Sequence, residues 1–193
     1  MREKEPVQID NGFYISRRLD SEDDVEKLIR AGIKRVVFFS VMPQMQIARA
    51  EEIWLNRRGI NLVCVPFPDF PESVMVGADS TIRNVLEKIG NPRKKPVLLH
   101  CFTGNSSQSF AIVYLISRGN TYSVAKKKVN AAVTSAGIRF HKIQPEEEKV
   151  LMQLETRYKT LFADRFRRRR FAALGGKRIV RAQKTRRPHR FQK

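Results

Sequence analysis

The stretch Val97-Leu98-Leu99-His100-Cys101-Phe102-Thr103-Gly104-Asn105-Ser106-Ser107 decides the fold class of this chain. It opens with a continuous apolar run, which is typical of a strand that is covered on both faces. A glycine-containing turn follows at once, and the residues from about 108 to 117 favour a helix. The stretch therefore predicts a strand, a tight turn and a helix in immediate succession.

Similar signals alternate through the first 150 residues. Apolar runs at 36–39 and 62–65 predict two more buried strands, and a short strand is expected at 13–15. Helical spacing of apolar residues occurs at about 21–31, 47–59, 74–90, 108–117, 122–135 and 146–162. This alternation predicts an α/β fold with a mainly parallel central sheet flanked by helices. Such sheets bind ligands at the carboxyl ends of their strands, so a site is expected in the loop after Leu99.

Charge divides the chain into two parts. The formal net charge is +19, and residues 165–193 hold 13 Lys and Arg residues but no Asp or Glu. Residues 1–164 thus hold 25 basic and 19 acidic residues, a net charge of +6. We expect an α/β domain at 1–162 and a basic C-terminal extension at 163–193. The extension lacks the apolar periodicity of a folded segment, so we expect it to be disordered until it binds a partner.

The composition argues against several other classes of protein. Cys64 and Cys101 are too few for a secreted disulfide scaffold, which favours a reducing intracellular setting. No CxxC or HxxxH spacing occurs, so we expect neither a metal nor a cofactor. No apolar run approaches the roughly 20 residues needed to cross a bilayer. Residues 1–10 resemble neither a secretory signal nor a transit peptide. A mitochondrial and a nuclear or nucleolar location both stay open.

The turn after the third strand has the chemistry of an anion site. A helix N-terminus presents unpaired N–H groups and a partial positive charge. Gly104 lets successive N–H groups converge, and Cys101 beside them is a candidate thiolate nucleophile. A phosphate or a similar anion is expected as a weak ligand. The residues expected to bind it are His100, Gly104, Asn105, Ser106 and Ser107.

These residues carry a resemblance to a known family. His100, Cys101 and Gly104 match the pattern His-Cys-x-x-Gly-x-x-Arg-Ser/Thr, so the sequence resembles the tyrosine and dual-specificity phosphatase superfamily, particularly its small bacterial-type branch. The similarity extends over about residues 10–140. It implies a phosphatase-like fold with Cys101 as the nucleophile. It also implies that Asp69, which lies 32 residues earlier in a proline-rich segment, is the acid that protonates the leaving group.

The chain departs from this pattern at the arginine. That position falls on Ser107, or on Ser106 if the loop is one residue shorter. Arginine offers a phosphate two parallel charged donors, and the loss of one transition-state donor typically costs about 3 kcal/mol. Unless Lys95 or Arg118 reaches the loop, both catalytic positions are vestigial and the chain is a pseudophosphatase. The alternatives are an active cysteine-dependent phosphatase with an atypical loop, acting on a protein or a small molecule, and a module that recognises phosphorylated partners without hydrolysing them.

The basic extension indicates a polyanionic partner. Lys and Arg neutralise phosphates, while the interspersed aromatic residues can stack on unpaired bases. The extension is longer than a nuclear localisation signal requires, and it lacks the apolar face of a membrane-surface helix. We therefore expect RNA, most naturally rRNA, in a ribosome-like ribonucleoprotein particle with its neighbouring proteins. The residues expected to bind RNA are Arg165, Arg167, Arg168, Arg169, Arg170, Lys177, Arg178, Arg181, Lys184, Arg186, Arg187 and Arg190.

Overall fold

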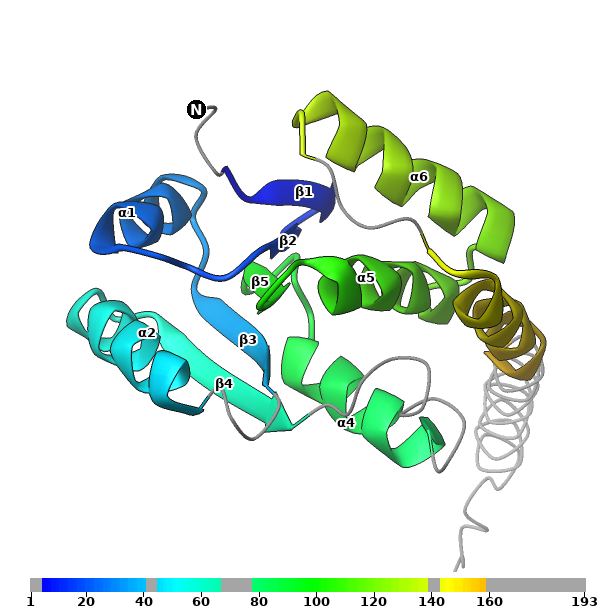
Figure 1. Ribbon diagram of the computed structural model, residues 1–193, viewed down its shortest axis with the longest axis horizontal. Coiled ribbons are helices and arrows are strands. Elements are labelled where there is room, and N and C mark those ends of the chain that lie inside the picture. Colours follow the sequence, from blue (N-terminus) through cyan, green and yellow to red (C-terminus); the bar gives the residue numbers. More distant parts are fainter. Residues whose placement is uncertain (1–4, 41–44, 67–77, 139–142, 159–193) are drawn as a thin grey trace, which may run out of the picture. The chain divides into compact units, whose positions relative to one another are not determined.

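The computed structural model describes residues 5–40, 45–66, 78–138 and 143–158 (Figure 1). Within them, five strands form one sheet in the order β1-β2-β5-β3-β4. The strands are β1 (Val7–Asp10), β2 (Phe13–Ser16), β3 (Arg35–Ser40), β4 (Asn61–Pro66) and β5 (Val97–Cys101). β1 runs antiparallel to β2, and the other pairings are parallel. The expected α/β fold with a mainly parallel sheet is confirmed.

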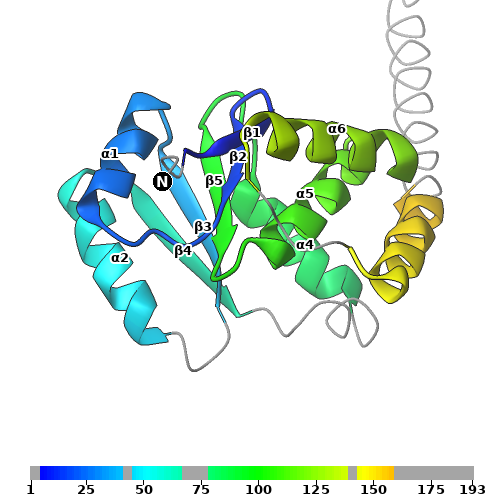
Figure 2. The same cartoon turned by 45° about the horizontal axis from the view of Figure 1, so that its top comes forward.

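Helices cover both faces of this sheet. They are α1 (Glu22–Arg30), α2 (Met45–Arg57), α4 (Ala78–Ile89), α5 (Asn105–Ser117) and α6 (Tyr122–Ser135), and a further helix spans 145–158. Figure 2 shows α1 and α2 on one face and α4, α5 and α6 on the other. No helix in the described ranges is long and apolar enough to cross a membrane.

The strands in the middle of the sheet form the core. Every residue of β5 is buried, because β2 and β3 flank it and helices cover both of its faces. The expectation that 62–65 is equally buried is wrong. β4 is an edge strand, in which Val65 is buried but Cys64 is exposed. β1 was not expected from the sequence, and it joins β2 through the two-residue turn Asn11-Gly12.

α5 differs from the other helices in its surroundings. It is buried from Ser107 to Ile116, which is its whole circumference over almost three turns. It packs against β5, β2 and α6. A helix enclosed in this way has no solvent-facing side, so its sequence shows none of the amphipathic pattern of a surface helix. Its position is therefore fixed by packing on all sides, and so is the loop that leads into it.

Candidate functional site

The loop between β5 and α5 is short. β5 ends at Cys101 and α5 begins at Asn105, three residues earlier than the start at about 108 that the sequence predicted. Gly104 has a φ of +95°, a conformation that glycine adopts without the steric penalty of a side chain. This turn brings the Gly104 N–H back to Cys101, where it donates a hydrogen bond to Sγ over 3.1 Å. The sulfur of Cys101 thus lies at the N-terminus of α5, and its residue is only 5% exposed.

Ser107 stands at the position where the superfamily pattern has arginine, and its side chain is used inside the protein. It is fully buried, and its hydroxyl lies 2.8 Å from the carbonyl oxygen of Gly104 and 3.0 Å from that of Ser16. The hydroxyl has one proton, so it donates to one of these carbonyls at a time. Sγ of Cys101 lies 3.9 Å from the hydroxyl oxygen of Ser107. Ser107 therefore ties the loop to the end of β2.

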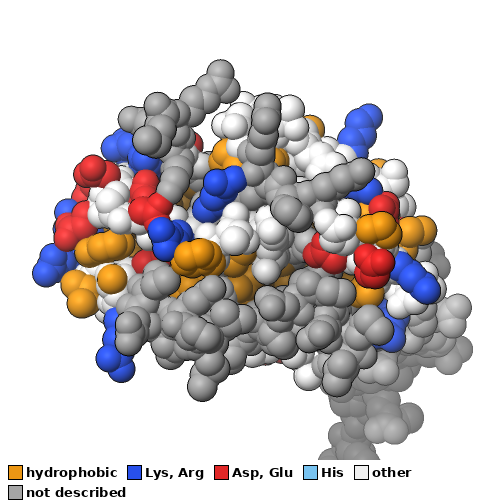
Figure 3. Space-filling model, viewed as in Figure 1, with side chains coloured by type: hydrophobic (Ala, Val, Ile, Leu, Met, Phe, Trp, Pro, Cys, Tyr) orange, Lys and Arg blue, Asp and Glu red, His pale blue; other side chains and the backbone are white. Residues whose placement is uncertain are grey.

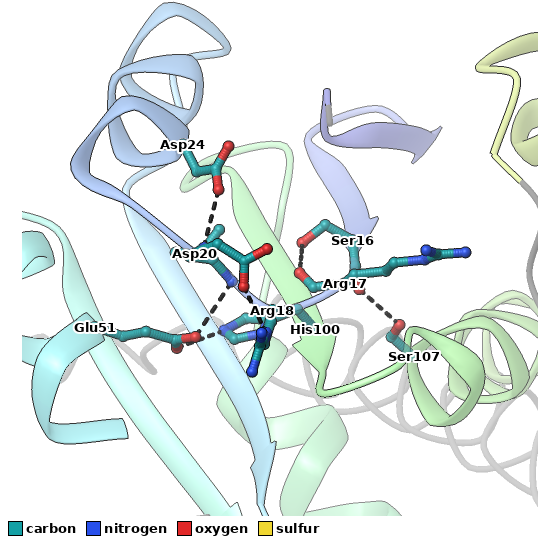
Figure 4. A network of polar contacts seen from close by, with 9 residues as sticks. Ser16, Arg17, Arg18, Asp20, Asp24, Glu51, His100 and Ser107 are labelled. Carbon is teal, nitrogen blue, oxygen red and sulfur yellow. Dashed lines mark hydrogen bonds and ion pairs between the residues drawn. The ribbon is translucent and has the colours of Figure 1, made fainter. Parts of the chain in front are cut away.

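His100 lies beneath the loop and faces α2. Its ring is fully buried and stacks on Phe38, with ring centroids 4.7 Å apart. Its Nε2 lies 3.2 Å from Oε2 of Glu51, at ion-pair distance but without the alignment of a hydrogen bond. Oε1 of the same carboxylate accepts a hydrogen bond from the N–H of Leu19 over 3.2 Å. Figure 4 shows Glu51 reaching from α2 toward His100.

Sequence reasoning missed Glu51. This residue is fully buried between Ala48 and Leu55, which are also buried on the same face of α2. An acid at a core position of an amphipathic helix needs a polar partner inside the protein. That pattern is the signal in the sequence, although it does not say that the partner is the histidine before Cys101. Glu51 thus joins α2, β5 and the segment after β2.

A second missed residue is Arg18, which comes from the segment between β2 and α1. Its guanidinium lies over the ring of Phe102, 4.5 Å from the centroid. Its Nε is also 2.5 Å from Oδ1 of Asp20, as Figure 4 shows. A cation therefore lies beside the loop, but a carboxylate and an aromatic ring already hold it. Because Arg18 is far from Cys101 in the sequence, no local motif pointed to it.

Two other candidate cations lie at the opposite end of the sheet. Lys95 precedes β5, whereas the loop follows β5. Arg118 caps the C-terminus of α5, and the loop leads into the N-terminus of that helix. The 13 residues of α5 span about 20 Å at 1.5 Å per residue. Neither side chain is placed to substitute for the missing arginine.

Some predicted residues fall elsewhere. Asp69 and the basic extension at 163–193 lie outside the described residues, as does the expected boundary after residue 162. Gly104 is buried, while Asn105 and Ser106 are half-buried at the start of α5. In the part of the chain that the structure describes, no group of His, Cys, Asp and Glu side chains could hold a metal ion.

Comparison with solved structures identifies the fold. Tk-PTP in its active form superposes with a TM-score of 0.57 at 24% identity, over 79% of this chain and 97% of that chain. A mouse putative dual specificity phosphatase complexed with zinc tungstate gives 0.55 at 18% identity, over 82% and 91%. PTPMT1 in complex with PI(5)P gives 0.63 at 11% identity, over 80% and 97%. No family model and no curated protein matches the sequence.

The chain therefore has the fold of the tyrosine and dual-specificity phosphatase superfamily. The resemblance inferred from His100, Cys101 and Gly104 is confirmed at the level of the fold. The strand, loop and helix that carry these residues are also those expected from the sequence.

Proposed function

We propose that this chain is a pseudophosphatase: a phosphatase-fold domain without efficient phosphoryl transfer, which binds RNA through its basic C-terminal extension in a ribonucleoprotein particle. The observation that carries the first half is Ser107. Its hydroxyl is fully buried and bonds to carbonyl oxygens of the protein, where the superfamily pattern has an arginine.

The loop keeps part of an anion site without its strongest donor. The N-terminus of α5 favours an anion, but the first turn of this helix carries no basic side chain. Arg18 is held by Asp20 and Phe102, so its charge is partly neutralised. The absence of one transition-state donor costs about 3 kcal/mol, which lowers the rate by roughly 150-fold. A missing bidentate arginine costs more than a single neutral donor, because its hydrogen bonds are charge-assisted.

The second half of the proposal rests on the sequence of the extension. Residues 165–193 hold 13 Lys and Arg residues and no carboxylate to neutralise them. Each phosphate that such a segment neutralises releases counterions, which makes binding strongly dependent on salt. The phenylalanines among the arginines supply faces on which unpaired bases stack. RNA offers both the phosphates and the unpaired bases.

The direct test compares the full chain with a variant that lacks residues 165–193. We expect the deletion to weaken binding to a structured RNA transcript by about 100-fold or more at low salt, and to remove most of the salt dependence. A full-length variant with Lys at Arg167, Arg168, Arg169 and Arg170 keeps the charge and is the matched control. Equal RNA affinity with and without the extension refutes the RNA half. Co-sedimentation of the native protein with ribosomal particles tests the particle.

The second candidate is an active cysteine-dependent phosphatase. The observation in its favour is the 3.1 Å hydrogen bond from the Gly104 N–H to Cys101 Sγ, since N–H donors stabilise a thiolate. Its test is hydrolysis of an aryl phosphate by the full chain. Turnover that Cys101→Ser abolishes and Asp69→Asn strongly reduces would establish the enzyme and remove the pseudophosphatase proposal.

A further inference from the structure

The turn before β5 presents three adjacent basic side chains. Arg93, Lys94 and Lys95 are all exposed. The N–H groups of Lys94 and Lys95 both donate to the carbonyl of Asn91, over 3.1 Å. None of the three side chains has an ion pair with a carboxylate in the described part of the chain. Their charge is therefore available to a partner.

This turn packs against the turn between β1 and β2. The Val97 N–H donates to the carbonyl of Gly12 over 2.9 Å, and a Cβ at Gly12 would lie 2.2 Å from the carbonyl oxygen of Pro92. Figure 2 shows the two turns side by side at the end of the sheet away from the loop that follows β5. The contact leaves no room for a side chain at Gly12, so the basic turn is held against the folded sheet.

Further cations surround the same place. Lys128 of α6 pairs with Asp10 over 3.0 Å. Burial raises the pKa of Asp10, but hydrogen bonds from Lys128 and Asn11, together with the charge of Arg93, lower it. Burial raises the pKa of Tyr114, and the charges of Arg118 and Arg93 oppose that rise. Lys34 lies next to the turn, because its N–H donates to the carbonyl of Pro96 over 3.0 Å. We define the basic cluster as Lys34, Arg93, Lys94, Lys95, Arg118 and Lys128.

The cluster concentrates the charge of the folded part of the chain. It contains six cations, and Asp10 is the carboxylate that pairs with one of them, which leaves a net charge of +5. The whole of residues 1–164 carries +6. Some basic residues elsewhere have acidic partners: Arg57 pairs with Glu22 and Arg58 with Glu26. Figure 3 shows the resulting mixture of acidic and basic side chains over α1 and α2.

Helix capping explains little of this arrangement. A cation at the C-terminus of a helix stabilises it through the helix dipole, an effect confined to the last turn. Arg118 is placed for this, because it caps α5. Arg93, Lys94 and Lys95 lie beyond α4, which ends at Ile89, and they belong to no helix. Three adjacent exposed cations without carboxylate partners instead form a surface suited to a polyanion.

We propose that the basic cluster is a second RNA-binding surface, which grips the phosphate backbone with the folded domain itself. The inference rests on the proposed RNA-binding function and adds a contact outside the extension. No aromatic side chain is exposed within the cluster, so it holds phosphates without reading bases. A membrane surface fits less well. Of the exposed large apolar side chains in the described ranges, Val124 alone lies on an element of the cluster, α6.

The experiment measures RNA affinity against salt for the full-length chain and three full-length variants. The first replaces Arg93, Lys94 and Lys95 with Gln, and the second retains the charge with Lys94→Arg and Lys95→Arg. The third is the control Arg57→Gln with Arg58→Gln, whose cations are already paired. The probe is a transcribed RNA hairpin with a long single-stranded flank. Circular dichroism and thermal unfolding check that each variant is folded.

We expect the Gln triple variant to bind about tenfold more weakly, and to reduce the slope of log affinity against log salt by about 2 to 3. The charge-retaining variant and the Arg57/Arg58 control should match the parent chain. Unchanged affinity and slope in a folded triple variant overturn the inference. Loss of binding to phosphatidylserine vesicles with unchanged RNA binding also overturns it, in favour of a membrane surface.

A fourth full-length variant separates this inference from the proposed function. It replaces Arg167, Arg168, Arg169 and Arg170 of the extension with Gln. If it binds RNA as the parent does while the 93–95 variant does not, the extension proposal fails and the cluster stands. If it alone loses affinity, the cluster fails and the extension stands.

Discussion

Replacement of Glu51 by alanine tests the buried support beneath the loop. The substitution leaves His100 Nε2 without the carboxylate that lies 3.2 Å away, and leaves the Leu19 N–H without its acceptor. Each buried polar group that loses its partner, here the His100 ring nitrogen and the Leu19 N–H, costs about 1–3 kcal/mol. These terms overlap, because both arise at one site. We expect Glu51→Ala to lower the free energy of unfolding by about 4 kcal/mol, a large fraction of the roughly 5–15 kcal/mol of a typical domain.

The assay is urea unfolding of the full chain, followed by the fluorescence of Trp54. This residue is the single tryptophan of the sequence, lies on α2 and packs against the core. Glu51→Gln is the graded variant. It keeps an oxygen for the Leu19 N–H, so its loss should be about 1–2 kcal/mol. Glu52→Ala is the matched control, because Glu52 is the next residue of the same helix and is exposed.

The order of the three variants decides the outcome. If Glu51→Ala costs no more than Glu52→Ala, the buried pair contributes nothing and the reasoning is refuted. If Glu51→Gln costs as much as Glu51→Ala, the negative charge rather than the hydrogen bond is what matters. Each result is read from the same unfolding curves.

Four further predictions concern the loop and the β1 edge. Ser107→Ala should lower stability by about 1–2 kcal/mol in thermal unfolding, because it removes the buried hydroxyl that hydrogen-bonds to the backbone of Ser16 and Gly104. Ser107→Arg should lower the stability further, because it places a guanidinium at a fully buried position. It should not increase aryl phosphate hydrolysis, and a gain of hydrolysis would contradict the prediction. Gly104→Ala should cost about 1–2 kcal/mol, since its φ of +95° disfavours a side chain, and equal melting temperatures would contradict this. Burial raises the pKa of Asp10, but hydrogen bonds from Lys128 and Asn11 hold it below its ordinary value of 3.8. This carboxylate therefore stabilises the fold above that value, and the stabilisation is lost as the pH falls through the lower pKa of the folded state. Lys128→Gln should lessen the difference in the free energy of unfolding between neutral and acidic pH. An unchanged difference would contradict this.

The sequence predicted the elements that local pattern specifies. The apolar run at 97–99 and the glycine turn after it were enough to place β5, the loop and α5. β1 was missed although its signals were present. Val7 and Ile9 alternate with polar residues, and Asn11-Gly12 is a frequent two-residue hairpin turn. The run of alternating residues is only four residues long, and charged residues precede it.

Other features depend on distant parts of the chain. An apolar run at 62–65 predicts a strand, but only the order of the sheet decides whether that strand lies at the edge. Glu51 and Arg18 reach the loop from elements about 50 and 80 residues before it in the sequence. Their contacts follow from the crossover connections between strands, which periodicity does not reveal.

The enclosure of α5 has a consequence for how this fold varies. Because core side chains surround α5 on every side, packing holds the helix in place whichever side chains stand in the loop before it. A serine at the arginine position finds its hydrogen-bond partners within the backbone, so the architecture survives the exchange intact. The packing that positions α5 and the chemistry of the loop before it are therefore separate properties of this fold.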